Sequence, residues 1–211
     1  MKKVKKPVGL SDNYWNSLSA EHQEWYEVVR PMTKATYEVD VSLTQVERFL
    51  EQQSADMASM GGVFELDPDY QRGHVWSMAQ RVAYIESLLR EIAPRTIMFN
   101  APGYSREREP GDIPAHTFQC IDGLQRLTSV RKFMAGEIKV FGDKSCDDLT
   151  GSPFDPRRYR LSIAVYEFSN RADLLQFYLD LNTAGTAHSV EEIERVRGLL
   201  TEAQGPGQGN G

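Results

Sequence analysis

Residues 116–136 read HTFQCIDGLQRLTSVRKFMAG, and this stretch predicts a buried strand, a short turn and a helix. The strand is predicted over 116–122, where apolar and β-favouring residues predominate. The helix is predicted over 124–136, with Gly136 in its C-cap region. Gly123 lies between the two elements. The stretch therefore sets a strand–turn–helix unit as the centre of the fold.

Arg126 lies in the first turn of that predicted helix, where the helix dipole favours anions over cations. The position makes sense if an anionic ligand binds at this terminus, where the first N–H groups are free and an arginine can clamp phosphate oxygens. Gly123 would let the backbone approach the ligand, and Asp122 would hold a divalent cation or orient a water. The spacing leaves an alternative open, in which Asp122 is an N-cap and Arg126 a surface residue.

Helices and strands alternate irregularly around this unit, which predicts an α+β fold with a small mixed sheet flanked by helices. Further strands are predicted at residues 36–42, 63–67, 95–100 and 159–168, and further helices at 17–30, 42–53, 77–92, 169–182 and 189–200. The predicted organisation is an N-terminal arm and helix (1–35), a main domain (36–200) and a flexible tail (201–211).

Serines and apolar spacing define three of these helices. Ser19 and Ser77 are predicted N-caps, and Ser189 with Glu192 forms a predicted capping box. The helix at 17–30 is expected to bury Trp25, Val28 and Val29. The helix at 77–92 is expected to bury Met78, Val82, Ile85, Leu88, Leu89 and Ile92.

Composition limits the classes of protein that fit. The 211 residues are 40% hydrophobic and 26% charged, with a net charge of −6. This balance argues against a broad, sequence-independent DNA-binding face but leaves room for a local basic patch. Two cysteines, Cys120 and Cys146, are too few for a disulfide framework or a four-cysteine zinc site, so a reduced, cytoplasmic setting is expected. No apolar run reaches the length of about 18–20 residues of a membrane span.

Two other stretches carry candidate ligand contacts. In DYQRGHVW (69–76), Gln71 and Arg72 lie between a predicted strand and a helix, and a second arginine at such a junction suggests a second phosphate contact. Trp76 is better explained as a core anchor. In LNTAGTAHS (181–189), Asn182 ends a helix and Gly185 permits a tight turn, for which helix punctuation is the simpler explanation.

Taken in order, YQRGHVW, ESLLREIAPRTIMFN, IDGLQRLTSVRKF and FYLDLNTAGTAHSVEEIERVR resemble the DGQQR-motif domain of the ParB/sulfiredoxin-like superfamily. That domain occurs at the N-terminus of GmrSD-type, modification-dependent restriction proteins. The resemblance covers roughly residues 36–198. It implies a ParB-like α+β fold and a site for nucleotide binding and hydrolysis.

The resemblance also implies roles for individual residues. It places Asp122, Arg126 and Arg72 in catalysis, with Asp122 also on Mg²⁺, and it assigns nucleotide binding to Gly123, Gln125, Gln71, Asn182 and Gly185. Leu124 departs from the family pattern, which usually has Gln at this position. No HNH-type nuclease signature occurs, so a separate nuclease subunit is an expected partner for the cleavage of DNA.

These features predict an enzyme that binds an NTP with Mg²⁺ and hydrolyses it or transfers its phosphoryl group, in DNA modification or restriction. One alternative is a sensor subunit that binds a nucleotide or modified DNA without turnover. The other is a DNA nuclease that works through a metal at Asp122.

Overall fold

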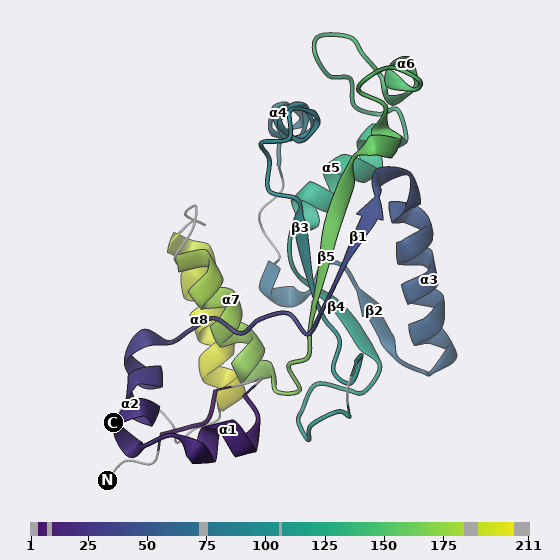
Figure 1. Ribbon diagram of the computed structural model, residues 1–211. Helices are drawn as coiled ribbons and strands as arrows, with labels where there is room; N and C mark the ends of the chain where they lie inside the picture. Colours follow the sequence, from purple (N-terminus) through teal and green to yellow (C-terminus); the bar gives the residue numbers. More distant parts are fainter. Residues whose placement is uncertain (1–3, 8–9, 72–75, 106, 184–189, 205–211) are drawn as a thin grey trace. The chain divides into compact units, whose positions relative to one another are not determined.

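The computed structural model describes residues 4–7, 10–71, 76–105, 107–183 and 190–204. Contacts between residues divide the chain into two compact units (Figure 1). One unit is Thr36–Ser169, and the other combines Met1–Ala35 with Asn170–Gly211. The predicted main domain of residues 36–200 stays a prediction, since the compact unit that contains the sheet ends at Ser169.

Five strands of the larger unit form one mixed sheet, in the order β1-β5-β3-β4-β2. The strands are β1 (Tyr37–Ser42), β2 (Val63–Glu65), β3 (Thr96–Asn100), β4 (Thr117–Asp122) and β5 (Arg160–Tyr166). The β1·β5 and β3·β4 pairs are antiparallel, whereas β5·β3 and β4·β2 are parallel. This mixed sheet with flanking helices confirms the predicted α+β class.

Strand β4 lies inside the sheet between β3 and β2, which explains its continuous apolar character. Phe118, Cys120 and Ile121 are completely buried. Phe118 contacts the rings of Phe64 and Phe99 on the neighbouring strands, with centroid distances of 6.0 and 4.7 Å. The predicted buried strand before Gly123 is therefore confirmed.

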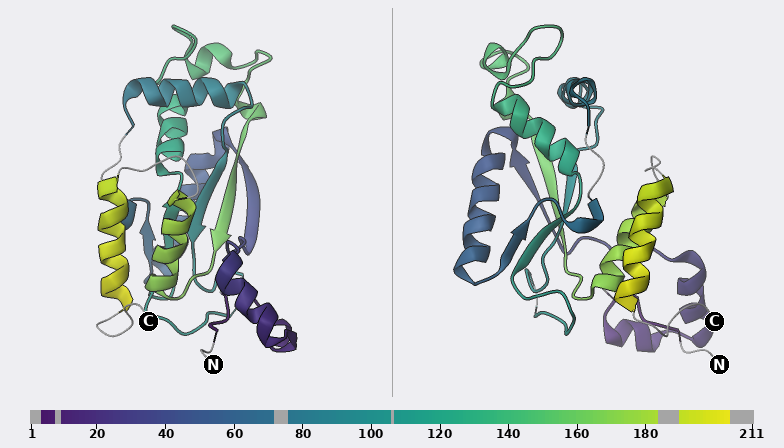
Figure 2. Two further views of the ribbon diagram at one scale, coloured as in Figure 1. Left: turned by 90° about the vertical axis from the view of Figure 1, so that its left-hand side faces the viewer. Right: turned by 180° about the vertical axis from the view of Figure 1, so that it is seen from behind.

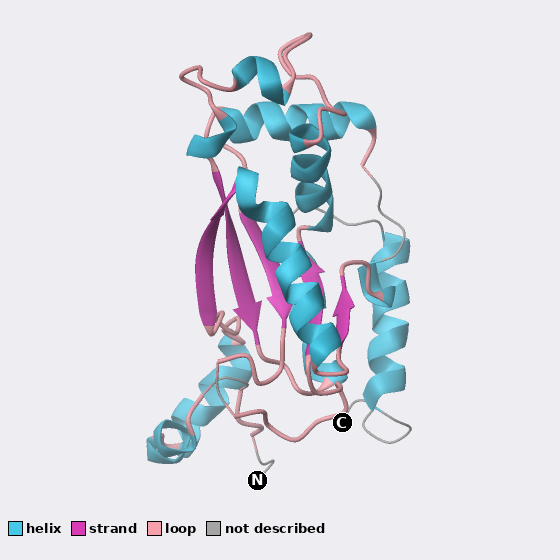
Figure 3. Ribbon diagram, turned by 90° about the vertical axis from the view of Figure 1, so that its right-hand side faces the viewer, coloured by secondary structure: helices cyan, strands magenta, loops and turns pink. Residues whose placement is uncertain are grey.

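Four α-helices and three short 3₁₀ turns accompany the sheet. They are α3 (Val46–Ser59), α4 (Met78–Leu89), α5 (Leu124–Met134), α6 (Cys146–Leu149), η1 (Leu43–Gln45), η2 (Asp69–Gln71) and η3 (Pro156–Arg158). Helix α3 lies across one face of the sheet (Figure 3). Helix α4 crosses over α5 and packs against it (Figure 2). Because α5 follows β4 directly, this crossing brings α4 to the β4–α5 junction.

Helix α4 begins where its cap predicts and buries the predicted face, except at the two ends of the stripe. Ser77 is the N-cap and forms a capping box with Gln80. The predicted buried stripe is confirmed at Ile85, Leu88 and Leu89, which are at most 4% exposed. It is wrong at Met78 and Ile92, which are exposed. The helix ends at Leu89 and Glu91 has a positive φ, so Ile92 no longer follows the helical period.

The smaller unit contains α1 (Asp12–Ser17), α2 (Ala20–Val29), α7 (Arg171–Thr183) and α8 (Val190–Gln204). Ser19 caps α2 as predicted, and its side chain accepts a hydrogen bond from the His22 N–H. The predicted apolar face of α2 is wrong, because Trp25, Val28 and Val29 are exposed and α2 buries none of its residues. Trp15, on the unpredicted helix α1, is buried instead. Ser189 and its predicted capping box lie outside the described residues.

Candidate functional site

The candidate site lies at the junction between β4 and α5. Asp122 ends the strand, Gly123 is the helix N-cap and Leu124 begins the helix. Gly123 has φ = +96°, a left-handed conformation that glycine adopts at little cost. A Cβ at this position would lie 2.8 Å from Ile97 Cδ1 and 3.2 Å from Arg126 Nη2. Two features therefore favour glycine at this position: the left-handed backbone of the turn, and the lack of room for a Cβ beside Ile97 and Arg126.

Arg126 forms an ion pair with Asp122, through its Nη2 and the Oδ2 of the carboxylate. Both side chains keep partial contact with solvent, at 19% and 27% exposure. The pair explains part of the arginine's position, because the carboxylate compensates the unfavourable cation in the first helical turn. An anionic ligand at this terminus would therefore meet a guanidinium that already has one acidic partner.

The junction nevertheless keeps unused hydrogen-bond donors. The Nε of Arg126 is buried and has no hydrogen-bond partner within the described part of the chain. The Gly123 N-cap provides no side-chain hydrogen bond to the start of α5, and the first N–H groups of any helix have no partner inside the helix. Backbone N–H groups at a helix start and a guanidinium nitrogen without a partner each favour an anion.

Gln71 reaches the same strand end from η2. Its side-chain Nε2 donates a hydrogen bond to the carbonyl oxygen of Cys120, at 2.8 Å. The Tyr70 hydroxyl donates to the same oxygen, at 2.9 Å. The Gln71 side chain is thus held at the carbonyl oxygen of Cys120, two residues before Asp122. Its predicted contact with a nucleotide stays a prediction.

Gln125 connects the junction to α4. Its Oε1 accepts hydrogen bonds from the Trp76 backbone N–H and from Arg81 Nη2, both at 3.1 Å. Trp76 is half-buried against the core and stacks at a tilt on Tyr84, with ring centroids 5.4 Å apart. The expectation that Trp76 serves as a core anchor is confirmed.

The structure also brings Arg81 to the site, a residue that is missing from the predicted set. Arg81 is 7% exposed and lies beside Gln125. A signal was present, since Arg81 precedes the buried Ile85 by four residues and so lies on the same helical face. A charged residue in line with a buried apolar stripe is uncommon and indicates a specific role.

Three predicted site residues remain. Arg72 and Gly185 lie outside the described residues. Asn182 lies on α7 in the smaller unit, where its Nδ2 donates to the Tyr178 carbonyl oxygen at 2.7 Å. Its predicted contact with a nucleotide stays a prediction.

Burial controls the acid–base behaviour of two groups around the junction. It raises the pKa of the Cys120 thiol to about 12, and the Asp122 carboxylate adds to the effect. Burial also raises the pKa of Tyr84 to about 12, while the Arg126 charge opposes that shift. Both groups are thus neutral at physiological pH, and among the described residues that meet at the junction the formal charges are those of Asp122, Arg126 and Arg81.

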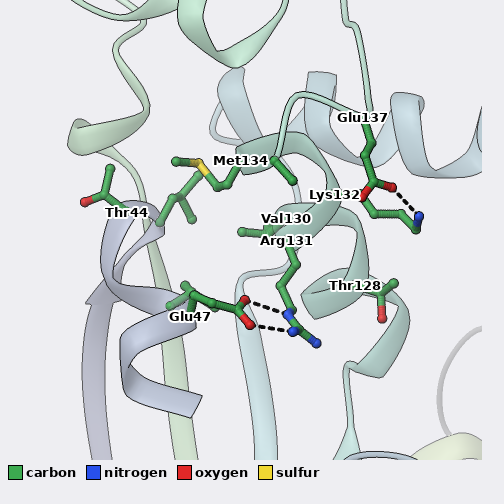
Figure 4. Close-up of a pocket in the computed structure, with 11 residues that line it drawn as sticks. Thr44, Glu47, Thr128, Val130, Arg131, Lys132, Met134 and Glu137 are labelled. Atoms are coloured by element: carbon green, nitrogen blue, oxygen red, sulfur yellow. Dashed lines mark hydrogen bonds and ion pairs between the residues drawn. The ribbon is translucent and has the colours of Figure 1, made fainter. Parts of the chain in front are cut away.

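A separate cavity of about 590 Å³ lies between η1, α3 and the outer side of α5 (Figure 4). Its charged side chains neutralise one another: Arg131 binds both carboxylate oxygens of Glu47, at 2.7 and 2.5 Å, and Lys132 pairs with Glu137. None of the predicted site residues lines it. The cavity is therefore a different feature from the β4–α5 junction.

Comparison of the sequence with protein-family models identifies the family of this chain. Residues 46–196 match the model described as GmrSD restriction endonuclease, N-terminal domain. The chain belongs to this GmrSD N-terminal domain family. The match runs from the start of α3 into α8 and includes the whole β4–α5 junction. Membership supports a role in DNA restriction, as the resemblance implied.

No curated protein and no solved structure showed a significant match to this GmrSD N-terminal domain. Within the described residues, none of the helices has the length and apolar character needed to cross a membrane. The same residues contain no group of three or more His, Cys, Asp or Glu side chains arranged to hold a metal ion.

Proposed function

We propose that this GmrSD N-terminal domain binds a nucleoside triphosphate at the β4–α5 junction and hydrolyses it or passes on its terminal phosphoryl group. The supporting observation is the buried Nε of Arg126, which has no partner among the described residues, beside the uncapped start of α5. Phosphate oxygens accept hydrogen bonds from guanidinium and helix N-terminal N–H groups. The Asp122–Arg126 pair would hold the guanidinium in place for this contact.

The residues present fit magnesium only together with a nucleotide. Asp122 is the carboxylate of the junction, and one of its oxygens is occupied by Arg126. Mg²⁺ in such sites is usually held by one or two carboxylates together with substrate phosphates. Asp122 would therefore contact an ion that the phosphates also bind, and this ion would neutralise phosphate charge.

Hydrolysis would form a bond from a water oxygen to the γ-phosphorus and break the bond from that phosphorus to the β–γ bridging oxygen. The products are a nucleoside diphosphate and phosphate. Asp122 is the group at the junction that can orient the water and accept its proton. Gln71 and Gln125 would fix the strand end and the helix start on either side, and Arg72 would add a second phosphate contact.

One observation favours a second function, nucleotide binding without turnover. Asp122 is already paired with Arg126, and a carboxylate engaged in an ion pair is a weaker base. In a restriction system, such a domain would sense a nucleotide and pass the signal to DNA or to a nuclease partner.

Incubation of the purified chain with each NTP and Mg²⁺ distinguishes these functions. We expect saturable binding and release of phosphate, and we expect Arg126→Gln to weaken binding by about tenfold to a hundredfold, the usual cost of one charged hydrogen bond. Arg48→Gln is the control, since Arg48 is exposed on α3 and far in sequence from the junction. Binding without phosphate release would favour the sensor, whereas absence of binding would refute both functions.

A further inference from the structure

Arg81 is a buried arginine with an unused nitrogen. Its Nε donates to the Trp76 carbonyl oxygen at 3.2 Å, and its Nη2 donates to Gln125 Oε1 at 3.1 Å. Its Nη1 is buried without a hydrogen-bond partner within the described part of the chain. Both groups that Arg81 binds are neutral, so its positive charge is not balanced by either.

Other arginines of the described chain contrast with this arrangement. Arg126, Arg131 and Arg157 each pair with a carboxylate, whereas no ion pair is present for Arg81 among the described residues. Removing a charge from water costs several kcal/mol when no opposite charge compensates it. A fold keeps such a residue more readily when a bound anion supplies the missing charge.

The location of Arg81 shows where that anion would bind. Gln125, which accepts from Arg81, is the second residue of α5 and directly precedes Arg126. Tyr84 lies one turn after Arg81 on α4, and Arg126 is close enough to lower its pKa against the effect of burial. Arg81 and Arg126 therefore approach the same helix start from two different helices, and each has one buried, unpartnered nitrogen.

We infer that Arg81 is a second cationic contact for the phosphates bound at the β4–α5 junction. The described part of the site contains two guanidinium groups and one carboxylate, that of Asp122. Together with the uncapped start of α5, these groups give the site a surplus of positive charge. That surplus suits a chain of two or more phosphates better than a single carboxylate ligand. The nucleotide source of these phosphates rests on the proposed function, but the anion contact does not.

The test compares Arg81→Met with the wild-type chain, using sodium pyrophosphate without added metal and each NTP with Mg²⁺ as separate probes. Methionine retains much of the side-chain volume and removes the charge. We expect Arg81→Met to bind pyrophosphate about tenfold to a hundredfold more weakly and to lose the rise in melting temperature that pyrophosphate gives the wild type. Arg48→Met is the matched control, because it removes the same charge from an exposed position on α3 and should keep the wild-type response.

A purely structural role gives the opposite pattern, in which Arg81→Met melts at a lower temperature but binds pyrophosphate like the wild type. That result would overturn the inference and leave the proposed nucleotide site at Arg126 intact. Binding of pyrophosphate that depends on Arg81, without binding of any NTP, would support the inference and refute the proposed function. Absence of both kinds of binding in the wild type would refute both.

A second measurement needs no folded variant at Arg81. In wild-type chain with ¹⁵N-labelled arginine, the Nε–H resonance of Arg81 should shift as pyrophosphate is added, while that of the exposed Arg48 should not. An unchanged Arg81 resonance at saturating pyrophosphate would also overturn the inference.

Discussion

Asp122 and Arg126 are four residues apart, and their ion pair explains how a cation is tolerated in the first turn of α5. The sequence indicated that this arginine needs an anionic partner. The structure supplies an internal partner, and the unpartnered Nε leaves one donor for a ligand. The predicted structural alternative is wrong, because the N-cap is Gly123 and not Asp122, and Arg126 is an ion-paired side chain with only 19% exposure.

Gly123 provides a residue-scale prediction. Gly123→Ala should lower the free energy of unfolding by about 2–3 kcal/mol, since it combines a left-handed backbone with a Cβ too close to Ile97. Gly136→Ala is the control that measures only the cost of placing alanine in a left-handed backbone conformation. Gly136 has φ = +76° and no atom within 4 Å of an added Cβ, so its cost should be about 1–2 kcal/mol.

Urea denaturation of the two variants measures the difference directly. If both substitutions lower the free energy of unfolding equally, the Ile97 side chain can move away from the added Cβ without a measurable loss of stability. In that case, packing would not explain why residue 123 is glycine, and close approach of a ligand would again become the better explanation.

Most of the candidate site could be predicted because its members are close in sequence. Asp122, Gly123, Gln125 and Arg126 share one strand–turn–helix unit, so local reasoning places them together. Arg81 reaches the site only because α4 crosses α5, and this crossing depends on tertiary packing. The helical periodicity of α4 predicts that Arg81 lies on the buried face, but this periodicity does not show which residues Arg81 contacts.

At the scale of elements, all five strands appear where alternation or apolar character predicts them. The order β1-β5-β3-β4-β2 could not be predicted, since pairing depends on contacts between distant segments. Helix α2 shows the same limit. Its apolar stripe predicted burial, yet the stripe is exposed, because periodicity does not show whether another element covers a face.

Asn100 provides an element-scale prediction. This completely buried residue ends β3, and its carboxamide donates to the Phe168 carbonyl oxygen at 3.0 Å and accepts from the Phe168 N–H at 2.7 Å. It thus continues the pairing of β3 with the chain beyond β5. Asn100→Ala removes this partner from two buried backbone groups and should cost about 2–4 kcal/mol of stability.

The matched control for that substitution is Asn13→Ala. Asn13 is exposed on α1, and its replacement should change the free energy of unfolding by less than about 0.5 kcal/mol. Both values come from chemical denaturation of the whole chain. A cost at Asn100 as small as that at Asn13 would mean that water readily replaces the lost carboxamide.

At the scale of the whole molecule, the family match and the compact units divide the chain differently. The GmrSD N-terminal domain match extends over residues 46–196. The unit that contains the sheet, Asp122, Arg126 and Arg81 is Thr36–Ser169. Asn182 and Gly185, which the resemblance assigns to nucleotide binding, belong to the other unit. Local patterns could not predict where the sheet-containing unit ends, because the periodicity of a helix does not show which unit covers its apolar residues.

The fragment 36–169 tests which division matters for function. It contains all five strands and one continuous core, so we expect it to fold alone with a cooperative thermal transition. If the β4–α5 junction holds the phosphates by itself, the fragment should bind pyrophosphate within about threefold of the affinity of the whole chain, a difference of less than about 1 kcal/mol. A folded fragment that binds pyrophosphate normally but has lost NTP binding would assign recognition of the nucleoside to residues 170–211. A folded fragment without pyrophosphate binding would show that Arg81 and Arg126 are insufficient, and that the phosphate site needs residues from both units.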